Sequence, residues 1–566
     1  MALATVTDTA WRYALERSVF LQAHRGVASR TLPELSLAAS ESRTVEDQQL
    51  LARLRSVPLA GLTGEEWLTH RILEWTLEMQ VEGRQYYWLE FAVLPYQTFE
   101  AGPVEELAAA HDLATAEGRQ GYLSLLDAYT RQLGERLFKT REQARRGIRI
   151  PKPALPGAVA TYRSLADQGA ETLRVSAERL QGVDGPTAYA FRRAVDARVD
   201  AGIKTVMRSI AEYLDSGEYK DAAPTRVGLA QYPQGREYYR YLVRLHTTLR
   251  LTPEEVFAYG GKRMAELGSQ MKEVRRSLGF SGSHGEFAKL LRREPRLRSK
   301  TPDELGAKYL GYVERIRPRV GELFAQTPKA PFGVRRLDPA AEAGMTFGYY
   351  QAPTARNPRG EYFFNASRLE EKTTLEVGKL IYHELVPGHH FQVSRQMENE
   401  SLPLLRREAL DFTAYSEGWA DYAAVLATEM GLLDDPYDRY GDLTNEAFTV
   451  ARLVLDTGLN YFGWPPERAA EYFRQHAFIS EAQIGTEVLR YSTDIPGQAL
   501  GYRIGQRHFE ELRARARREL GMAFDIRAFH EQMIGSGAMP LGVLTEHLER
   551  FLASQKAAPM ARSCGR

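Results

Sequence analysis

The chain of 566 residues has almost no cysteine, no long apolar run and almost no net charge. Its one cysteine, Cys564, lies at the end of the sequence, so we expect neither a disulfide framework nor a cysteine-ligated metal. No stretch reaches about 18 uninterrupted apolar residues, so no membrane span is expected. Lys+Arg 74 against Asp+Glu 73 gives no support to binding of nucleic acid or of a membrane surface. The first residues show no secretory signal, and we therefore expect a cytoplasmic protein.

Helical periodicity dominates the first 330 residues, where apolar side chains recur three and four positions apart with charged side chains between them. Two helix starts are marked, because Thr252 and Thr301 are each followed by proline and two acidic residues, a pattern typical of N-caps. We therefore predict a mainly helical fold. The clearest predicted helices span residues 65–82, 120–146, 186–218, 253–278 and 302–327.

Strand character is confined to a short region, about residues 333–365. Three segments rich in β-forming residues, 333–337, 345–350 and 361–365, are separated by turn-forming residues. We predict a small antiparallel sheet directly before the motif described next. An exposed edge of this sheet could pair with an extended peptide, or the sheet could serve only to support the following helix.

Three of the twelve histidines fall within residues 383–390, His-Glu-Leu-Val-Pro-Gly-His-His. A histidine followed by glutamate, with a second histidine nearby, is typical of zinc hydrolases, in which the glutamate takes a proton from the metal-bound water. The usual second ligand lies at i+4, whereas His389 and His390 lie at i+6 and i+7 from His383. On a straight helix, i+6 is rotated by about 120° and i+7 lies about 10 Å further along, so neither could share an ion with His383.

Pro387 and Gly388 offer a solution to this spacing. Proline breaks the helix and glycine accepts unusual dihedrals, so a two-residue bulge would bring His389 into the place of the second ligand. We expect a capping box over residues 373–376 to open the helix that carries His383. The alternative is a buried helix that ends in a Pro-Gly turn, with incidental histidines.

A second helix, predicted over residues 408–430, is apolar on most faces and should be buried. Glu417 and Asp421 lie in its middle and need partners there, and a metal is one such partner. Gly418 would let this helix approach its neighbour closely. Glu417 as third ligand completes a site of two histidines and one glutamate with one position open for water. The alternative is a salt-bridged glutamate in the core.

Further segments accompany the histidine motif: residues 415–422 (Tyr-Ser-Glu-Gly-Trp-Ala-Asp-Tyr), 452–458 (Arg-Leu-Val-Leu-Asp-Thr-Gly), 490–491 (Arg-Tyr) and 496–505 (Pro-Gly-Gln-Ala-Leu-Gly-Tyr-Arg-Ile-Gly). With His-Glu-x-x-Pro-Gly-His-His, this set resembles the bacterial family of unknown function numbered 885 (DUF885). The resemblance extends upstream to residues 238–248 and so covers most of the chain. Many members of this family are secreted or lipid-anchored.

The resemblance implies a large helical, zincin-like metallopeptidase fold, similar in outline to oligopeptidases, with a deep channel. Residues 1–330 would then form one wall of the channel, and residues 331–566 would form the catalytic region with the metal site. Residues 491–496 differ from the aromatic-rich sequence that is usual before Pro-Gly-Gln, and this bears on substrate preference rather than on the metal site.

Four other polar residues are candidates for the site. Tyr502 could donate a hydrogen bond to the developing oxyanion, and Arg490 could bind a substrate carboxylate. Core hydrogen bonding and a structural ion pair are the respective alternatives. Asp421 or Asp456 could hold a ligand histidine through its other ring nitrogen.

We therefore hypothesise one Zn²⁺ per chain, held by His383, His389 and Glu417. The resemblance favours His389 as the second ligand, and His390 would then line the cleft. Glu384 would act as the general base in cleavage of a peptide or amide bond of a small peptide-like substrate.

Two other classes of protein stay open. The same ligand set suits a non-haem Fe(II) enzyme, which does not need a glutamate directly after the first histidine. The second class comprises proteins that bind a metal but are not peptidases. Examples are a biosynthetic amidase, an enzyme that acts on a small metabolite, and a protein that only binds its ligand.

Overall fold

The computed structural model describes residues 2–95, 101–342, 348–354 and 357–563. The chain divides into two compact units. The first comprises Met1–Ala60, Leu73–Tyr238 and Ser492–Ile495, and the second comprises Gly61–Ile72, Tyr239–Tyr491 and Pro496–Arg566. The boundary predicted at residue 330 falls inside the second unit, because the helices that precede it pack on the helices that follow it.

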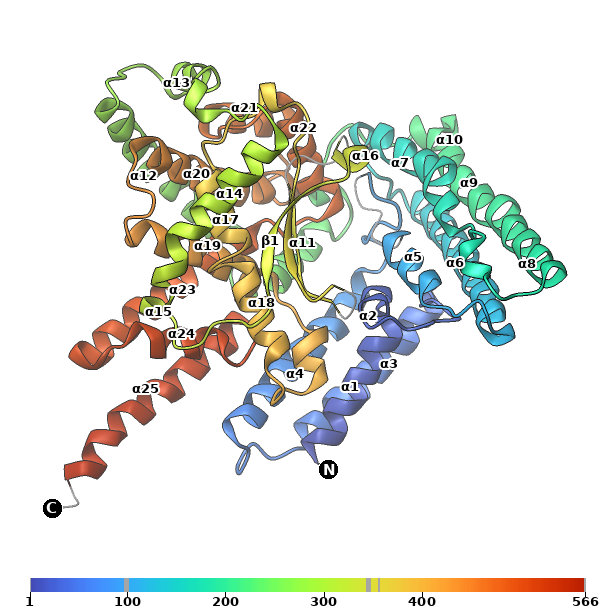
Figure 1. Ribbon diagram of the computed structural model, residues 1–566, viewed down its shortest axis with the longest axis horizontal. Coiled ribbons are helices and arrows are strands. Elements are labelled where there is room, and N and C mark those ends of the chain that lie inside the picture. The colour runs from blue at the N-terminus through green and yellow to red at the C-terminus, as the bar shows by residue number, and fades with distance from the viewer. Residues whose placement is uncertain (1, 96–100, 343–347, 355–356, 564–566) are drawn as a thin grey trace. The chain divides into compact units, whose positions relative to one another are not determined.

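The helices α2 and α5 to α10 of the first unit contribute to one apolar core (Figure 1, blue to green). Leu125 of α6, Ala158 of α7 and Ile210 of α9 are fully buried in this core. The helices are α1 (Leu3–Arg17), α2 (Val19–His24), α3 (Leu37–Arg55), α5 (Ala101–Ala109), α6 (Ala116–Arg145), α7 (Leu155–Asp167), α8 (Gly185–Ala197), α9 (Thr205–Asp215) and α10 (Gly217–Lys220), while α4 (Gly64–Gly83) and α11 (Gly235–Thr247) run from one unit into the other.

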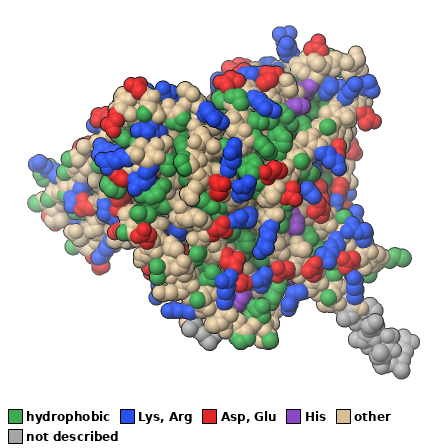
Figure 2. Space-filling view, turned by 180° about the vertical axis from the view of Figure 1, so that it is seen from behind, with side chains coloured by type: hydrophobic (Ala, Val, Ile, Leu, Met, Phe, Trp, Pro, Cys, Tyr) green, Lys and Arg blue, Asp and Glu red, His purple; other side chains and the backbone are tan. Residues whose placement is uncertain are grey.

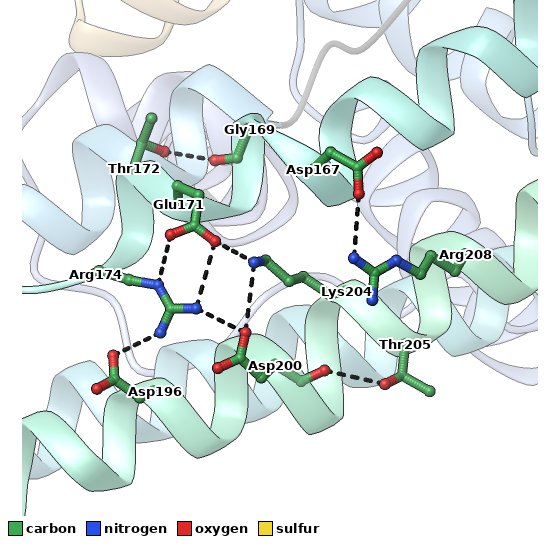
Figure 3. Close-up of polar contacts among 10 residues, drawn as sticks. All are labelled: Asp167, Gly169, Glu171, Thr172, Arg174, Asp196, Asp200, Lys204, Thr205 and Arg208. Atoms are coloured by element: carbon green, nitrogen blue, oxygen red, sulfur yellow. Dashed lines mark hydrogen bonds and ion pairs between the residues drawn. The ribbon is translucent and has the colours of Figure 1, made fainter.

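An ion-pair network lies on the first unit (Figure 3). Arg174 pairs with Glu171, Asp196 and Asp200, at 2.6, 2.7 and 2.6 Å, and Lys204 bridges Glu171 and Asp200. The three carboxylates are about half exposed. Water therefore screens these pairs, and we expect each to contribute at most about 1 kcal/mol to stability.

The second unit contains the remaining helices and the only sheet among the described residues. Its helices are α12 (Pro253–Ser277), α13 (His284–Leu291), α14 (Pro302–Ile316), α15 (Val320–Leu323), α16 (Pro339–Glu342), α17 (Val377–Glu384), α18 (His389–Glu398), α19 (Thr413–Glu429), α20 (Pro436–Asn460), α21 (Pro466–His476), α22 (Glu481–Leu489), α23 (Leu500–Leu520), α24 (Ile526–Ile534) and α25 (Leu541–Ser563). Figure 1 draws them from green to red.

Two close helix pairs organise this second unit. A Cβ on Gly260 of α12 would lie 2.9 Å from Leu453 and Val454 of α20, so these two helices run in close contact. A Cβ on Gly418 of α19 would lie 2.4 Å from the Cα of Gly505 on α23. The close approach predicted at Gly418 is thus confirmed, and α23 is the neighbour that requires it.

The predicted helices are largely confirmed, with differences at their ends. Three of them correspond to α4, α6 and α12. The helix predicted over residues 186–218 consists of α8, the π-helical segment Arg198–Lys204 and α9. The helix predicted over residues 302–327 ends at Ile316 and is followed by a short 3₁₀ turn and α15. Thr252 and Thr301 cap α12 and α14 as predicted. None of the described helices is long and apolar enough to cross a membrane.

The sheet is mixed, and the prediction of an antiparallel sheet is wrong for one of its two pairings. Its order is β1 (Phe332–Arg336), β3 (Gly360–Phe364), β2 (Tyr349–Gln351); β1 and β3 are parallel, and β2 is antiparallel to β3. The chain passes through α16 and β2 between β1 and β3, so it returns to the starting end of β1, as a parallel pairing requires. Residues 345–347 of the predicted middle strand lie outside the described residues.

One face of the sheet supports α17. Tyr362 and Phe364 of β3 are buried in a cluster with Tyr309 of α14 and Ile381 of α17. In Figure 1 the elements β1, α14 and α17 accordingly lie side by side. The sheet and α14 therefore fix the helix that carries His383.

Two predicted helix starts are wrong. No side chain caps α17, which begins at Val377 after Glu376, and the hydroxyl of Thr374 accepts a hydrogen bond from Lys308 instead of capping the helix. The helix predicted from residue 408 begins at Thr413, after a π-helical turn at Leu405–Ala409. In both places tertiary contacts override the local pattern.

Lys, Arg, Asp and Glu side chains are interspersed over the face drawn in Figure 2. This mixture agrees with the formal net charge of +1.

Candidate metal centre

A sharp turn at residues 385–388 joins the two helices that carry the histidines. The helix α17 ends at Glu384 and α18 begins at His389, so the prediction of a bulge inside one continuous helix is wrong. A Cβ on Gly388 would lie 1.8 Å from the carbonyl oxygen of His383, which shows how tightly the chain folds back. The indole of Trp419 donates a hydrogen bond of 3.1 Å to the carbonyl of Pro387, whose peptide bond with Val386 is cis.

This turn brings together the three residues predicted as ligands. The Nε2 atoms of His383 and His389 lie 3.4 and 3.3 Å from the same oxygen, Oε2 of Glu417 on α19. The two imidazole rings are 4.7 Å apart between centroids and nearly perpendicular, at 85°. Within the described part of the chain, this is the one group of three His, Cys, Asp or Glu residues whose ligand atoms lie within 4.8 Å of one another.

The Oε2 atom of Glu417 is buried and has no hydrogen-bond partner among the described residues. This oxygen lies within ion-pair distance of both imidazole nitrogens, but neither contact has the geometry of a hydrogen bond. Donor atoms about 2.0–2.2 Å from one ion at tetrahedral angles lie about 3.3–3.5 Å apart. The observed separations therefore fit a small cation held among these three atoms.

The charges of the cluster also favour a cation. Burial alone would lower the pKa of His383, but its hydrogen bond with Asp421 and its pairing with Glu417 outweigh burial and raise the pKa to about 10. Burial likewise would raise the pKa of Glu417, but pairing with the two histidines holds it far below its usual range. The site thus holds a full carboxylate and attracts positive charge.

Asp421 orients one of the histidines. Its Oδ1 lies 2.8 Å from Nδ1 of His383, and the side chain is almost fully buried, one helical turn beyond Glu417. Because Nδ1 is engaged in this way, Nε2 is directed toward Glu417. Asp456, the other candidate for this role, does not reach the cluster; its carboxylate accepts hydrogen bonds from Tyr239, the backbone of Gly497 and Asn460.

Glu384 is the last residue of α17 and follows His383 directly. Burial is the largest cause that raises the pKa of its carboxyl group, and the negative charges of Glu417 and Asp421 raise it further, against the effect of the histidines. No hydrogen bond to a described residue occupies this carboxylate, so it is free to accept a proton from a water molecule at the cluster.

Tyr502 of α23 lies beside the cluster, as predicted. Its ring is parallel to that of His383, at 6.0 Å between centroids and 8° between planes. Burial is the main reason that its pKa is raised, and the nearby negative charge of Glu417 raises it further. The phenol is therefore a protonated donor near the two ligands on α17 and α19.

The prediction that His390 lines a cleft is wrong, because this side chain has no exposed surface. Its Nε2 lies 3.1 Å from the carbonyl of Ala330 and its Nδ1 lies 3.0 Å from the hydroxyl of Tyr350. A carbonyl can only accept, so Nε2 carries the proton and Nδ1 accepts from the tyrosine. His390 therefore connects α18 to the sheet through Tyr350.

Two neighbours of the cluster were not found from the sequence. The ring of Tyr350 on β2 is nearly parallel to that of His389, at 6.4 Å. Asp411, hydrogen-bonded to Ser416, is close enough to Glu417 for their charges to interact, and burial raises its pKa. Neither residue belongs to a recognisable spacing, so only the folded chain reveals them.

Arg490 follows α22 and does not contact the three ligands directly. Its Nη2 donates a hydrogen bond of 3.1 Å to Gln498, and its Nη1 lies 3.6 Å from Glu487. Arg490 and Tyr502 are near enough for each to shift the pKa of the other through its charge.

Comparison with known families and solved structures shows which proteins this chain is similar to. Residues 21–548 match the family described as "Bacterial protein of unknown function (DUF885)", and the chain therefore belongs to this family. No curated protein is significantly similar to it.

Two solved structures share the fold. One is a protein of Colwellia psychrerythraea described as a presumed lipoprotein, with a TM-score of 0.87 and 23% identity over 98% of this chain and 99% of the other. The second is a presumed lipoprotein of unknown function from Shewanella oneidensis, with a TM-score of 0.75 and 17% identity over 96% of this chain and 99% of the other. At these identities the likeness concerns the fold alone.

Proposed function

We propose that this DUF885 protein is a zincin-like, zinc-dependent hydrolase that cleaves a peptide or amide bond in a small peptide-like substrate. One observation carries the proposal. A buried, unpartnered carboxylate oxygen of Glu417 lies 3.3 and 3.4 Å from the Nε2 atoms of two histidines, and a second carboxylate, that of Glu384, directly follows one of them. The residues that would serve as ligands and as base are thus close to one another in the fold.

In the proposed mechanism His383, His389 and Glu417 would hold one Zn²⁺. When bound, the ion would supply a Lewis acid that polarises the substrate carbonyl and acidifies water. The carboxylate of Glu384 takes one proton from the attacking water and returns it to the amine nitrogen as the C–N bond breaks, so the base is regenerated. Asp421 keeps His383 in one tautomer and orientation.

Tyr502 has a separate part in the proposal. The tetrahedral stage of amide hydrolysis concentrates negative charge on the former carbonyl oxygen, and a fixed O–H donor lowers the energy of that stage. Because burial keeps the phenol of Tyr502 protonated, its hydroxyl remains such a donor near His383.

Other functions of the same cluster remain alternatives. A biosynthetic amidase, another hydrolase of a small metabolite, or a protein that only binds a metal would use the same ligands. An Fe(II) enzyme would also accept two histidines and one carboxylate, but it has no need of the base Glu384. The cytoplasmic location and the channel predicted from the sequence belong to the proposal too, and cell fractionation tests the location.

A digest tests the proposal directly. Zinc-loaded protein is incubated with a mixed peptide library, and new termini are read by mass spectrometry. We expect cleavage that Glu384→Gln reduces at least about 100-fold while zinc content stays near one per chain. Glu273→Gln, an exposed change of the same kind on α12, should leave the rate unaltered.

The outcomes separate the alternatives. Cleavage of no peptide by the zinc-loaded protein would contradict peptidase action, and full occupancy by iron would contradict the choice of metal. Loss of zinc from Glu384→Gln would mean that this residue is a ligand rather than the base.

A further inference from the structure

The ring of Tyr502 leads from the metal cluster to a second polar group. The guanidinium carbon of Arg452 on α20 lies 4.6 Å from the centre of this ring. Arg452 is buried, and its donors are engaged by the hydroxyl of Tyr491 at 3.0 Å and by Glu487 at 3.4 Å. These contacts make Arg452 a fixed part of the wall behind Tyr502.

Arg490 shares the same carboxylate. Glu487 lies 3.6 Å from Arg490 and also accepts a hydrogen bond from Tyr491. Two guanidinium groups and one phenol therefore share a single, nearly fully buried carboxylate, so Glu487 alone cannot neutralise both arginines.

Asp456 is a second carboxylate whose charge interacts with that of Arg490. Asp456 accepts hydrogen bonds from Tyr239, Gly497 and Asn460. Burial raises its pKa to about 7, so it carries less than a full negative charge at neutral pH. Glu487 and Asp456 together therefore do not fully neutralise Arg452 and Arg490.

Exposure decides between the two arginines. The side chain of Arg452 is 6% exposed, whereas that of Arg490 is 28% exposed. A guanidinium group has five N–H donors, and among the described residues only Gln498 accepts a hydrogen bond from Arg490. The planar guanidinium group of Arg490 is therefore partly exposed and has N–H donors available, as needed to bind a carboxylate through two parallel hydrogen bonds.

We infer that Arg490 binds the C-terminal carboxylate of a peptide substrate, so that the enzyme removes residues from the carboxyl end. This inference rests on the proposed function, because a peptide must reach the cluster of His383, His389 and Glu417. In the reaction, water adds across the amide bond, the acyl part gains a carboxylate, and the amine that leaves is the segment whose carboxylate Arg490 holds.

Two peptide libraries test the inference. N-acetylated tripeptides varied at their last two positions are made once with a free C-terminal carboxylate and once as C-terminal amides. Hydrolysis by the zinc-loaded protein is measured for both. Binding is measured separately, by equilibrium dialysis of both libraries against the Glu384→Gln protein with mass-spectrometric counting, so that one readout does not depend on turnover.

We expect the wild type to prefer the free acids by roughly 10- to 100-fold, the effect of a hydrogen-bonded charge pair. Arg490→Gln should lose this preference, because the free acids should be hydrolysed more slowly and the amides at nearly the same rate. In the dialysis experiment, the double variant with Glu384→Gln should likewise bind the acids more weakly and the amides about equally. Arg490→Lys should restore part of it, because lysine keeps the charge but not the fork. Arg474→Gln on α21, a control at an exposed ion pair, should keep the full preference.

A merely structural role of Arg490 would lower all rates together and leave the ratio of acid to amide unchanged, which would overturn the inference. Equal treatment of acids and amides by the wild type would overturn it as well. If the zinc-loaded protein hydrolyses neither library, the proposed function fails; dialysis then still decides whether Arg490 selects carboxylates.

Discussion

Asp421 and Glu417, one turn apart on α19, contact opposite nitrogens of one imidazole ring. The Oδ1 atom of Asp421 lies 2.8 Å from Nδ1 of His383, and Oε2 of Glu417 lies 3.4 Å from Nε2 of the same ring. Residues four apart share a helix face, so one helix both supplies a candidate ligand and orients another. The motif on α17 and the motif on α19 are therefore joined in a single cluster of side chains.

Asp421→Asn should weaken zinc binding without removing it. The amide oxygen still accepts a hydrogen bond from Nδ1, but the negative charge that strengthens His383 as a ligand is lost, and such changes typically reduce metal affinity 10- to 100-fold. Competition with a chromophoric chelator measures this affinity. Asp456→Asn is the matched control, since Asp456 contacts Tyr239, Gly497 and Asn460 and no candidate ligand; an equal loss of affinity in both variants would contradict the role of Asp421.

Gly388→Ala should disturb the site although it changes no ligand. The new Cβ would lie 1.8 Å from the carbonyl oxygen of His383, so α17 and α18 must separate. We expect a loss of at least about 1–3 kcal/mol in the free energy of unfolding, as in overpacked cores, together with weaker zinc binding. Denaturant unfolding and chelator competition measure the two effects.

Gly261→Ala is the control for this change. Position 261 is in α12, and a Cβ there would meet nothing within 4 Å, so the substitution should stabilise the helix by roughly 0.5–1 kcal/mol. A Gly388→Ala protein with unchanged stability and zinc affinity would show that the turn at residues 385–388 accommodates a side chain.

Glu376→Gln should change how stability depends on pH. Burial raises the pKa of Glu376 to about 7, well above its ordinary value of 4.5. Between these values the unfolded chain has released the proton and the folded chain still holds it, so this residue makes the folded state less stable as pH rises from 4.5 to 7. Glutamine does not titrate. The variant should therefore gain up to about 3 kcal/mol relative to the wild type over this interval.

Denaturant unfolding of both proteins at pH 4.5, 6 and 7.5 measures this difference. Glu370→Gln, an exposed change just before α17, should run parallel to the wild type at all three values. If the difference between Glu376→Gln and wild type stays constant with pH, the carboxyl group of Glu376 titrates normally.

The sequence was sufficient for the helical class and for the three clustered residues, for different physical reasons. Helical periodicity and capping at Thr252 are local, so they survive in the fold. The grouping of His383, His389 and Glu417 could be predicted because few side chains bind metals, and because the resemblance to DUF885 favoured His389 over His390 as the second ligand.

The details that the sequence did not reveal depend on contacts between distant segments. The turn at residues 385–388 is held by Trp419, which lies 32 positions beyond Pro387. The parallel pairing of β1 with β3, the burial that raises the pKa of Glu376 and the pairing of His390 with Ala330 are likewise set by tertiary packing. No local pattern in the chain encodes these contacts.

His389→Ala and His390→Ala should separate the two adjacent histidines. His389 faces Glu417 at 3.3 Å, so its removal takes away one of three donors, and we expect zinc content to fall well below one per chain with little change in the free energy of unfolding of the metal-free protein. His390 has no exposed surface, and it hydrogen-bonds Ala330 and Tyr350. Its removal leaves a cavity and two unpaired groups, which should cost about 2–4 kcal/mol in stability.

The His390→Ala protein should nevertheless bind zinc at the wild-type stoichiometry wherever it remains folded. Elemental analysis after gel filtration gives the zinc content, and denaturant unfolding in the presence of a chelator gives the stability of each variant without the contribution of the metal. The free energy of unfolding should thus fall mainly in His390→Ala, and the zinc content mainly in His389→Ala. Loss of zinc in His390→Ala with retention in His389→Ala would reverse the assignment and would require α18 to be rotated from the orientation described above.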